Sequence, residues 1–260
     1  MNPWRAFDVA PAQGPCAGVP AMTVRLHQFA PGFGLPNGSP FCMKAEAYLR
    51  MAGIDYRCEN GALPFRAPRR KLPWIDDGGT VVADSGFIVR HLEASRGAPL
   101  DGWLSARDRA IGHGVQRTLE ENTYWVAIHY RWVDEPGWRL TRQQFFGALP
   151  PGVSGMVGWI ARRKLRRDCL GQGTGLHTAE EIAAIGRADF DALATLLDDG
   201  REYLLGARPS SYDAVALAFL ANLLWVPIDS PVRRHALQQP VLVAYCDRLM
   251  TRVFPEYRKP

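Results

Sequence analysis

The chain has 260 residues, of which 47% are hydrophobic and 22% are charged, and this supply of apolar side chains excludes a wholly disordered protein. Its length is what two domains of ordinary size require. The 31 basic and 26 acidic residues give a net charge of +5, a mild bias toward anionic small molecules or surfaces that falls far short of a nucleic-acid-binding surface.

The first 21 residues contain four prolines and two glycines, and no run of about 7–15 apolar residues such as a signal peptide requires. We therefore expect a flexible arm over residues 1–21. Further along, the longest apolar stretch, residues 214–228, is interrupted by Asn222 and Pro227 and is shorter than the roughly 18–20 residues of a membrane-spanning helix. That stretch predicts a buried core helix, and we expect no transmembrane segment.

Alternating apolar and polar residues over 23–29 predict a half-buried strand. A loop rich in Gly and Pro follows and ends at Ser39-Pro40, where a Ser N-cap and a Pro at the first helical position predict the start of a helix. That helix is expected to end at Gly53, a typical C-terminal cap, and residues 56–59 predict a second strand.

The next segment predicts a β-hairpin and a helix. Asp77-Gly78-Gly79 supplies the turn between residues 72–75 and a strand over 80–83. The helix is expected to begin at Asp84-Ser85 and to end at Gly97. Together these elements predict a compact mixed α/β unit over residues 22–97.

Strand patterns stop after a short linker, residues 98–103, and residues 104–260 predict an all-helical domain. Aromatic residues at helical spacing indicate one long helix from Leu104 to about Val133. Capping boxes at Thr178-x-x-Glu181 and Ser210-x-x-Asp213 predict two further helix starts.

In chain order, Ser39-Pro40-Phe41-Cys42, Leu72-Pro73 and Asp84-Ser85, followed by a helical half, resemble the glutathione transferase superfamily. The resemblance covers residues 22–260, and residues 36–42 with their long preceding loop are similar to the branch that includes the metaxins and the failed-axon-connections proteins. It implies a thioredoxin-like N-terminal domain of βαβ-ββα order that binds glutathione. It also implies an all-helical C-terminal domain, a hydrophobic electrophile as second substrate, a role in detoxification, and a homodimer.

Ser39 lies fourteen positions before the helix-ending Gly53, where the superfamily carries its catalytic Ser or Cys, so the resemblance implies that Ser39 is the catalytic residue. A sulfur at a helix N-terminus meets unpaired N–H groups and the positive end of the helix dipole, and a Ser hydroxyl can donate a hydrogen bond to it. These interactions favour the thiolate, which is the nucleophile. The local sequence leaves open that Ser39 only caps the helix.

Cys42, in the first turn of the same helix, supports a second hypothesis. The helix dipole could lower the pKa of its thiol and make Cys42 the centre of a glutathione-dependent redox activity. A small cysteine buried in the core is the plainer interpretation.

Glutathione carries two carboxylates and one ammonium, so its site needs donors at both ends and an acceptor for the amine. The resemblance implies that Asp84 and Ser85 hold the γ-glutamyl end, with Asp84 where Glu is commoner, and that a cis peptide at Leu72-Pro73 presents backbone to the cysteinyl part. Lys71 is the residue we expect at the glycyl carboxylate. An ordinary helix cap at Asp84 and a solvated basic loop at Lys71 are the alternatives.

The superfamily places the electrophile between the first-domain loop and the first long helix of the second domain. The aromatic and apolar residues expected to line that pocket are Phe33, Leu35, Tyr124, Trp125, His129 and Trp132. Aromatic residues at helical spacing also fit a plain core. A non-catalytic scaffold like the metaxins, with the same fold and a vestigial site, is therefore the main alternative to an enzyme, and dependence on glutathione would separate the two.

The five cysteines have no Cys-x-x-Cys spacing and the six histidines no His-Glu-x-x-His motif, so we expect neither a disulfide scaffold nor a bound metal. Free thiols favour a reducing compartment, which we take to be the cytoplasm. The basic cluster at residues 162–167 is most simply a solvated helix face, with contact to an anionic membrane or a nucleic acid as the alternative.

Overall fold

The computed structural model describes residues 23–97, 100–150 and 152–257; the predicted arm over residues 1–21 and the first two residues of the predicted linker lie outside these ranges. Within them, a four-stranded sheet has the order β2-β1-β3-β4. The strands are β1 (Val24–Gln28), β2 (Tyr56–Asn60), β3 (Trp74–Asp77) and β4 (Thr80–Ala83). β1 and β2 are parallel, whereas β1 with β3 and β3 with β4 are antiparallel, the arrangement of a thioredoxin-like domain.

Two helices belong to this sheet, α1 (Pro40–Met51) and α2 (Ser85–Arg96). Ser39 precedes α1 in extended conformation and Pro40 is its first residue, as the sequence predicts. Both helices are followed by a glycine with positive φ, Gly53 at 65° and Gly97 at 59°. Only a residue without Cβ adopts this conformation at little cost, and therefore both predicted helix ends are confirmed.

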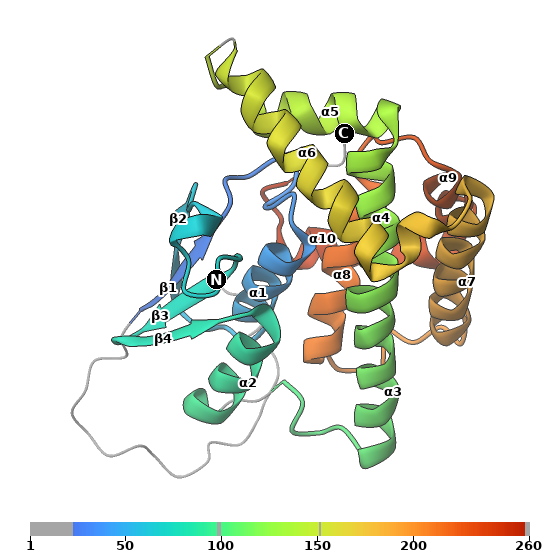
Figure 1. Ribbon diagram of the computed structural model, residues 1–260. Coiled ribbons are helices and arrows are strands. Elements are labelled where there is room, and N and C mark those ends of the chain that lie inside the picture. Colours follow the sequence, from blue (N-terminus) through green and yellow to red (C-terminus); the bar gives the residue numbers. More distant parts are fainter. Residues whose placement is uncertain (1–22, 98–99, 151, 258–260) are drawn as a thin grey trace.

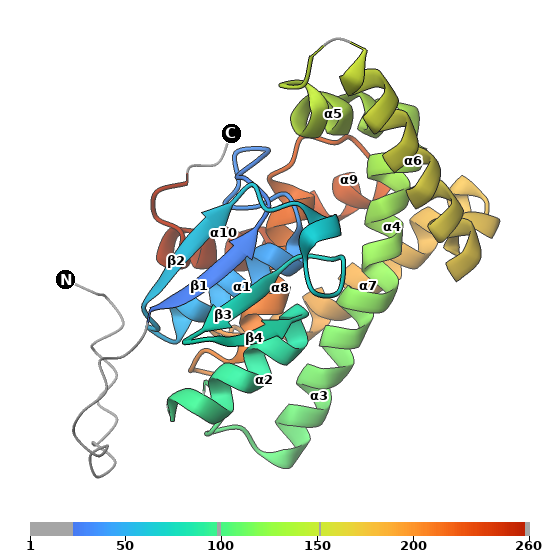
Figure 2. The same ribbon diagram turned by 60° about the vertical axis from the view of Figure 1, so that its left-hand side comes forward.

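The rest of the described chain is helical (Figures 1 and 2). Its α-helices are α3 (Ala106–Arg117), α4 (Tyr124–Ile128), α5 (Glu135–Phe146), α6 (Val153–Gln172), α7 (Ala179–Leu197), α8 (Ser211–Leu224), α9 (Pro231–Leu237) and α10 (Pro240–Val253), with short 3₁₀ turns at η2 (Pro64–Arg66) and η5 (Thr174–Leu176). Both predicted capping boxes are present, before α7 and before α8.

The long helix predicted from Leu104 to Val133 is less regular than expected. It begins at Ala106, because Ser105 and Asp108 form a capping box that fixes its first turn. Two π-helical segments, η3 (Thr118–Thr123) and η4 (His129–Val133), lie on either side of α4. Such widened turns shift every later side chain around the helix axis, so the spacing of the aromatic residues alone does not fix which way each one faces.

The core is centred on α8, which packs against α1 (Figure 1). All residues of α8 except Tyr212 and Leu223 are buried, and its alanines 214, 216, 218 and 221 have no exposed surface. Small side chains let the two helices approach closely. The predicted core helix is thus confirmed, and it ends at Leu224, before Pro227. Among the described helices, none combines the length and the apolar character needed to cross a bilayer.

Candidate active site at the start of α1

Sheet topology gathers the predicted site residues at one end of the sheet. β1 leads into the loop before Ser39, and its His27 pairs with Trp74, the first residue of β3 after Leu72-Pro73. Trp74 in turn pairs with Ala83, the last residue of β4 before Asp84. The start of α1, the Leu72-Pro73 turn and the start of α2 therefore lie at the same end of the sheet.

Ser39 is held by its backbone, and its side chain does not cap the backbone of its own helix. Its N–H donates to Asn37 Oδ1 (3.0 Å), and Asn37 Nδ2 donates to the Phe29 carbonyl (2.8 Å). No capping hydrogen bond from the half-buried Ser39 side chain to α1 is present in the described structure. Because the first N–H groups of a helix have no intrahelical partner, the start of α1 keeps donors for an anion.

A buried arginine, Arg131 of η4, lies directly behind this loop. Its guanidinium donates to the Gly38 carbonyl (2.6 Å) and to the Asn222 carbonyl and Oδ1 (2.7 and 3.0 Å). No carboxylate among the described residues forms an ion pair with it. Burial lowers the pKa of Arg131 to about 10, so the side chain keeps its charge at neutral pH. The sequence analysis missed Arg131, since its partners lie about 90 residues away on either side.

Cys42 is fully buried in a small cluster with Ala67 and Leu72. Burial raises the pKa of its thiol to about 12, although hydrogen bonds with Ser39 and with the Phe29 backbone oppose this shift. At neutral pH Cys42 is therefore a protonated core thiol, which favours the plainer of the two interpretations.

We expect Cys42 to resist alkylation in the folded protein, because its sulfur is covered and protonated. Iodoacetamide at neutral pH, followed by peptide mass spectrometry, should leave Cys42 unmodified until guanidinium unfolds the chain. As a control, we expect the Cys42→Ala variant to keep the full catalytic activity of the parent protein. Rapid labelling of Cys42 in the native protein would contradict the assignment of Cys42 as a protonated core thiol and would support the redox hypothesis.

The Leu72-Pro73 peptide is cis, as the resemblance implies. Both residues are buried, whereas Lys71 just before them is exposed. The Pro73 carbonyl accepts a hydrogen bond from the Asp84 N–H (3.3 Å) and so joins this turn to the start of α2.

Asp84 adopts a φ of 85°, unusual for a residue with a side chain, and caps α2. Its Oδ1 accepts from the N–H groups of Gly86 (2.8 Å) and Phe87 (3.3 Å). Ser85 beside it is 4% exposed. The short Asp side chain thus folds onto its own helix, where an anion would otherwise bind, so a ligand carboxylate and Asp84 compete for the same donors.

A buried ion pair between Lys44 of α1 and Glu120 of η3 faces the same helix start. Gln116 donates to Glu120 (3.0 Å), and a Cβ added to Gly86 would lie 4.0 Å from both Lys44 Nζ and Gln116 Nε2. Burial lowers the pKa of Lys44, and Glu120 opposes that shift. The only sequence signal for this pair is a lysine on an otherwise apolar face of α1.

The residues predicted to line a hydrophobic pocket fall into separate groups. Phe33 and Trp132 both contact Phe145 of α5, with ring centroids 5.7 and 6.0 Å apart. Tyr124 contacts Phe41 and its neighbour Trp125 at 5.0 and 5.3 Å. His129 instead packs against Tyr130 at 5.1 Å.

One member of that set does not offer a surface to a ligand: Leu35 is fully buried in the core. Phe145, which the sequence analysis missed, is one of the residues that connect the loop to the helical half, together with Arg131. A Cβ on Gly38 would lie 3.3 Å from its ring, next to Ser39.

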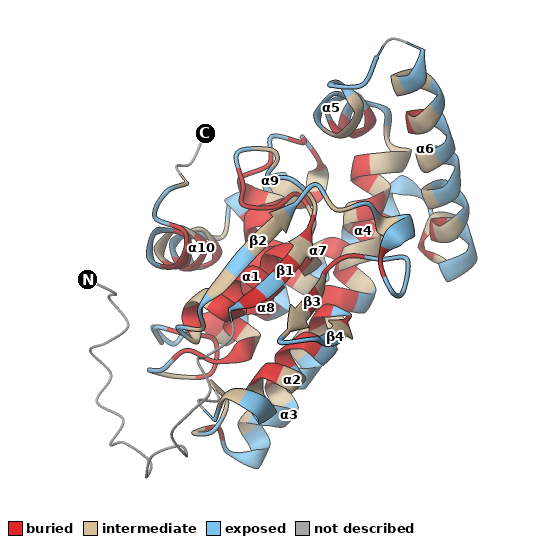
Figure 3. Cartoon of the chain, turned by 90° about the vertical axis from the view of Figure 1, so that its left-hand side faces the viewer, coloured by how far each residue is buried: buried red, intermediate tan, exposed pale blue. Residues whose placement is uncertain are grey.

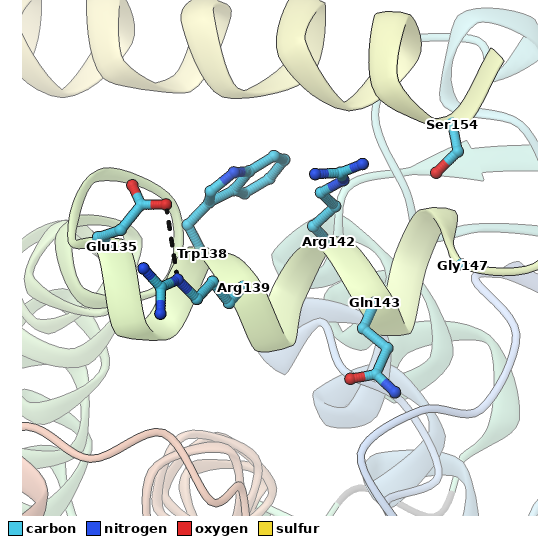
Figure 4. Close-up of a pocket in the computed structure, with 7 residues that line it drawn as sticks. All are labelled: Glu135, Trp138, Arg139, Arg142, Gln143, Gly147 and Ser154. Atoms are coloured by element: carbon cyan, nitrogen blue, oxygen red, sulfur yellow. Dashed lines mark ion pairs between the residues drawn. The ribbon is translucent and has the colours of Figure 1, made fainter. Parts of the chain in front are cut away.

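A cavity of about 420 Å³ lies away from Ser39, between α5 and the start of α6 (Figure 4). Trp138 and Arg142 of α5 point toward α6, and Arg139 lies beside Glu135. The other lining residues are Gln143, Gly147 and Ser154. None of the sequence-predicted site residues lines it.

Comparison with known proteins gives two family matches. A family model for the glutathione S-transferase N-terminal domain matches residues 40–137, and one for the C-terminal domain matches residues 186–249. Failed axon connections of Drosophila melanogaster is 28% identical over 250 residues, which are 90% of this chain; the chain spans 59% of the length of that protein. Metaxin-3 of Xenopus laevis is 24% identical and is covered over 77% of its length.

A bacterial enzyme is also similar. Isoprene-epoxide–glutathione S-transferase of Rhodococcus sp. (strain AD45) is 31% identical over 232 residues, which cover 87% of this chain and 97% of the enzyme. Among solved structures, a glutathione transferase of Phanerochaete chrysosporium superposes with a TM-score of 0.60 at 17% identity. The match covers 90% of this chain and 99% of the transferase. That structural likeness shows the fold alone.

Proposed function

Because this chain belongs to the glutathione transferase superfamily, we propose that it activates the thiol of glutathione at Ser39 and joins the sulfur to a hydrophobic electrophile. The observation that carries the proposal is the start of α1, where Ser39 has no capping bond to its own helix and adjoins unpaired N–H donors. The similarity to an isoprene-epoxide–glutathione S-transferase over 97% of that enzyme supports an enzymatic role.

The proposed chemistry needs a thiolate, and two features near Ser39 favour one. The N-terminus of α1 carries a partial positive charge, and the buried Arg131 guanidinium donates to the carbonyl of Gly38, one residue before Ser39. Charges that are shielded from water act more strongly than exposed ones. In the reaction a carbon–sulfur bond forms while the bond from that carbon to its leaving group breaks; with an epoxide, the released oxygen takes a proton from water.

We assign each part of glutathione to one of the remaining residues of the site. The Leu72 backbone is proposed to pair with the cysteinyl part, and Lys71 with the glycyl carboxylate. Ser85 and the first N–H groups of α2 are proposed to hold the γ-glutamyl carboxylate, with Asp84 accepting from the ammonium. Both present bonds of Asp84 go to Oδ1, so Oδ2 is the oxygen proposed to accept from the ammonium, whereas the ligand carboxylate competes with Oδ1 for the N–H groups of Gly86 and Phe87.

Calorimetric titration of the full chain with glutathione tests the proposal. Binding accompanied by ultraviolet absorbance of a thiolate near neutral pH is the expected result. If millimolar glutathione does not bind, the transferase proposal fails and the metaxin-like scaffold takes its place. An isoprene-type epoxide is the first acceptor to test, given the name of the bacterial relative.

Changing Asp84 should weaken glutathione binding by about 1.5–3 kcal/mol, the range for a lost charge-assisted hydrogen bond. Asp84→Ala also removes the cap of α2, whereas Asp84→Asn keeps a capping side chain and removes only the charge. Calorimetry on both variants therefore separates the amine contact from the cap. Unchanged affinity in Asp84→Asn would remove the proposed contact with the ammonium.

Among the residues that the structure describes, Cys42, Cys58 and Cys169 are free thiols. Free thiols persist in reducing compartments, and glutathione is abundant there, so we place the proposed activity in the cytoplasm. A homodimer is proposed from the superfamily resemblance alone.

A further inference from the structure

Helices α5 and α6 form a hairpin that projects from the helical half (Figure 1). Much of its surface is exposed, toward the tip above all (Figure 3). The hairpin lies almost wholly in residues 138–185, which neither family model covers. Its base is anchored: Phe145 contacts Phe33 and Trp132, and Arg162 donates to the carbonyls of Trp132 and Val133 (both 2.9 Å).

Large apolar side chains are exposed at the free end of this hairpin. They are Leu149 (38% exposed), Val153 (43%), Met156 (60%), Trp159 (60%) and Ile160 (54%), and we call them the apolar tip. Val153, Met156 and Ile160 recur at a spacing of three and four residues and so share one face of α6. A cluster of this kind on an exposed helix indicates contact with an apolar surface.

The same hairpin carries the positive charge of the protein. Residues 135–172 contain seven basic residues and two acidic residues, whereas the rest of the chain contains 24 basic and 24 acidic residues. Arg139 and Arg162 lie beside Glu135, and Lys164 pairs with Asp168. For the other four, the described residues provide no ion pair: Arg142, Arg163, Arg166 and Arg167. The net charge of +5 therefore comes entirely from the hairpin.

Apolar and basic residues are arranged in sequence along the exposed face of α6. All members of the apolar tip except Leu149 lie in the N-terminal half, and Arg163, Arg166 and Arg167 follow in the C-terminal half. The Arg163 guanidinium lies 5.5 Å from the Trp159 ring, where the two groups meet. Arg139 and Arg142 add charge on the α5 side, around the cavity of Figure 4.

We propose that the α5–α6 hairpin docks on the surface of an anionic lipid bilayer. The apolar tip enters the boundary between headgroups and acyl chains, a region that Trp prefers, and the arginines contact the negatively charged headgroups. Charge complementarity favours this partner, because a second copy of the chain would bring two hairpins of net charge +5 together, and the rest of the chain offers no negative surplus to match them. Nucleic acid would match the arginines and leave the apolar tip without a partner.

Flotation of the full chain with vesicles tests the proposal, with no glutathione present. Vesicles of phosphatidylcholine mixed with phosphatidylserine should carry the protein upward, and pure phosphatidylcholine vesicles should not. Added salt should weaken the binding, because it screens the headgroup charges. Equal binding to both vesicle types, or no binding to either, overturns the proposal.

Two variants separate the two halves of the interaction. Met156→Ser/Trp159→Ser should lower the bound fraction at least tenfold, and Arg163→Glu/Arg166→Glu should abolish binding. The matched controls outside the hairpin are Phe65→Ser/Leu176→Ser, at sites 68% and 77% exposed, and Arg57→Glu/Arg66→Glu, which should bind like the parent protein. The proposal is overturned if the hairpin variants bind vesicles as well as these controls do. It is also overturned if light scattering shows a dimer of the parent protein that Met156→Ser/Trp159→Ser converts to a monomer.

A fluorescence measurement on the unaltered chain, with one conservative variant beside it, does not depend on whether the serine and glutamate variants fold. Phosphatidylserine brominated on its acyl chains should quench tryptophan fluorescence on binding. In Trp159→Phe, which keeps an apolar ring, binding should persist and most of the quenching should be lost. Quenching that survives in this variant would show that the tip is not the inserted part.

Discussion

Replacing Ser39 by alanine is expected to lower kcat/KM for glutathione conjugation by about a hundredfold. The variant loses the hydroxyl that would donate to the thiolate, and removal of one such donor in an enzyme site costs about 10²–10³ in rate. The N-terminus of α1 and Arg131 remain, and the residual activity is assigned to them. The pKa of the bound glutathione thiol, followed by its thiolate absorbance, should rise toward the value of free glutathione.

Ser39→Thr is the matched variant, since it keeps a hydroxyl at the same position and should retain more activity than Ser39→Ala. The Ser39 side chain makes no capping bond to α1, so neither change should alter stability greatly. Full activity in Ser39→Ala together with its loss in Cys42→Ala would assign the sulfur chemistry to Cys42 instead.

Asp213→Ala is expected to have the largest effect on stability, a loss of at least about 3 kcal/mol in the free energy of unfolding. Asp213 has no exposed surface, and its carboxylate accepts four hydrogen bonds. The donors are the N–H of Leu204 (2.7 Å), the N–H and Oγ of Ser210 (2.8 and 2.7 Å) and the hydroxyl of Tyr245 (2.7 Å). Alanine would leave all four unpaired in the interior, at the start of the central helix α8.

Urea denaturation measures this loss as a lower midpoint at unchanged slope. Asp108→Ala is the control, because Asp108 occupies the same position in the exposed capping box before α3. Loss of the Asp108 side chain should lower the free energy of unfolding by only about 1 kcal/mol. If the two substitutions cost the same, the buried hydrogen bonds of Asp213 are not what stabilises the helical half.

Features that depend on neighbouring residues could be predicted from the sequence. The Ser39-Pro40 helix start, the Gly78-Gly79 turn and the capping box at Thr178 are each specified within four residues, and all three are confirmed. The cis peptide at Leu72-Pro73 could be expected only from the family resemblance, since a short X-Pro sequence by itself favours trans.

Features that depend on distant residues could not be predicted. Arg131 lies in an aromatic helix, and nothing near it in sequence indicates that its guanidinium will meet the carbonyls of Gly38 and Asn222. Leu35 has the apolar character of a pocket residue and is instead covered completely. The φ of 85° at Asp84 is likewise not indicated by the residue pattern, although its capping of α2 was one of the two alternatives that the sequence left open.

The packing of α1 has a consequence for cutting or exchanging parts of this chain. Ten of the twelve residues of α1 are buried, because the helix is covered by α8 as well as by its own domain. A fragment ending at Gly97 would expose the surface that α8 covers, and we expect it to aggregate rather than to bind glutathione. A chimaera made with a relative should therefore exchange α1 and α8 together, even though about 160 residues separate them in the chain.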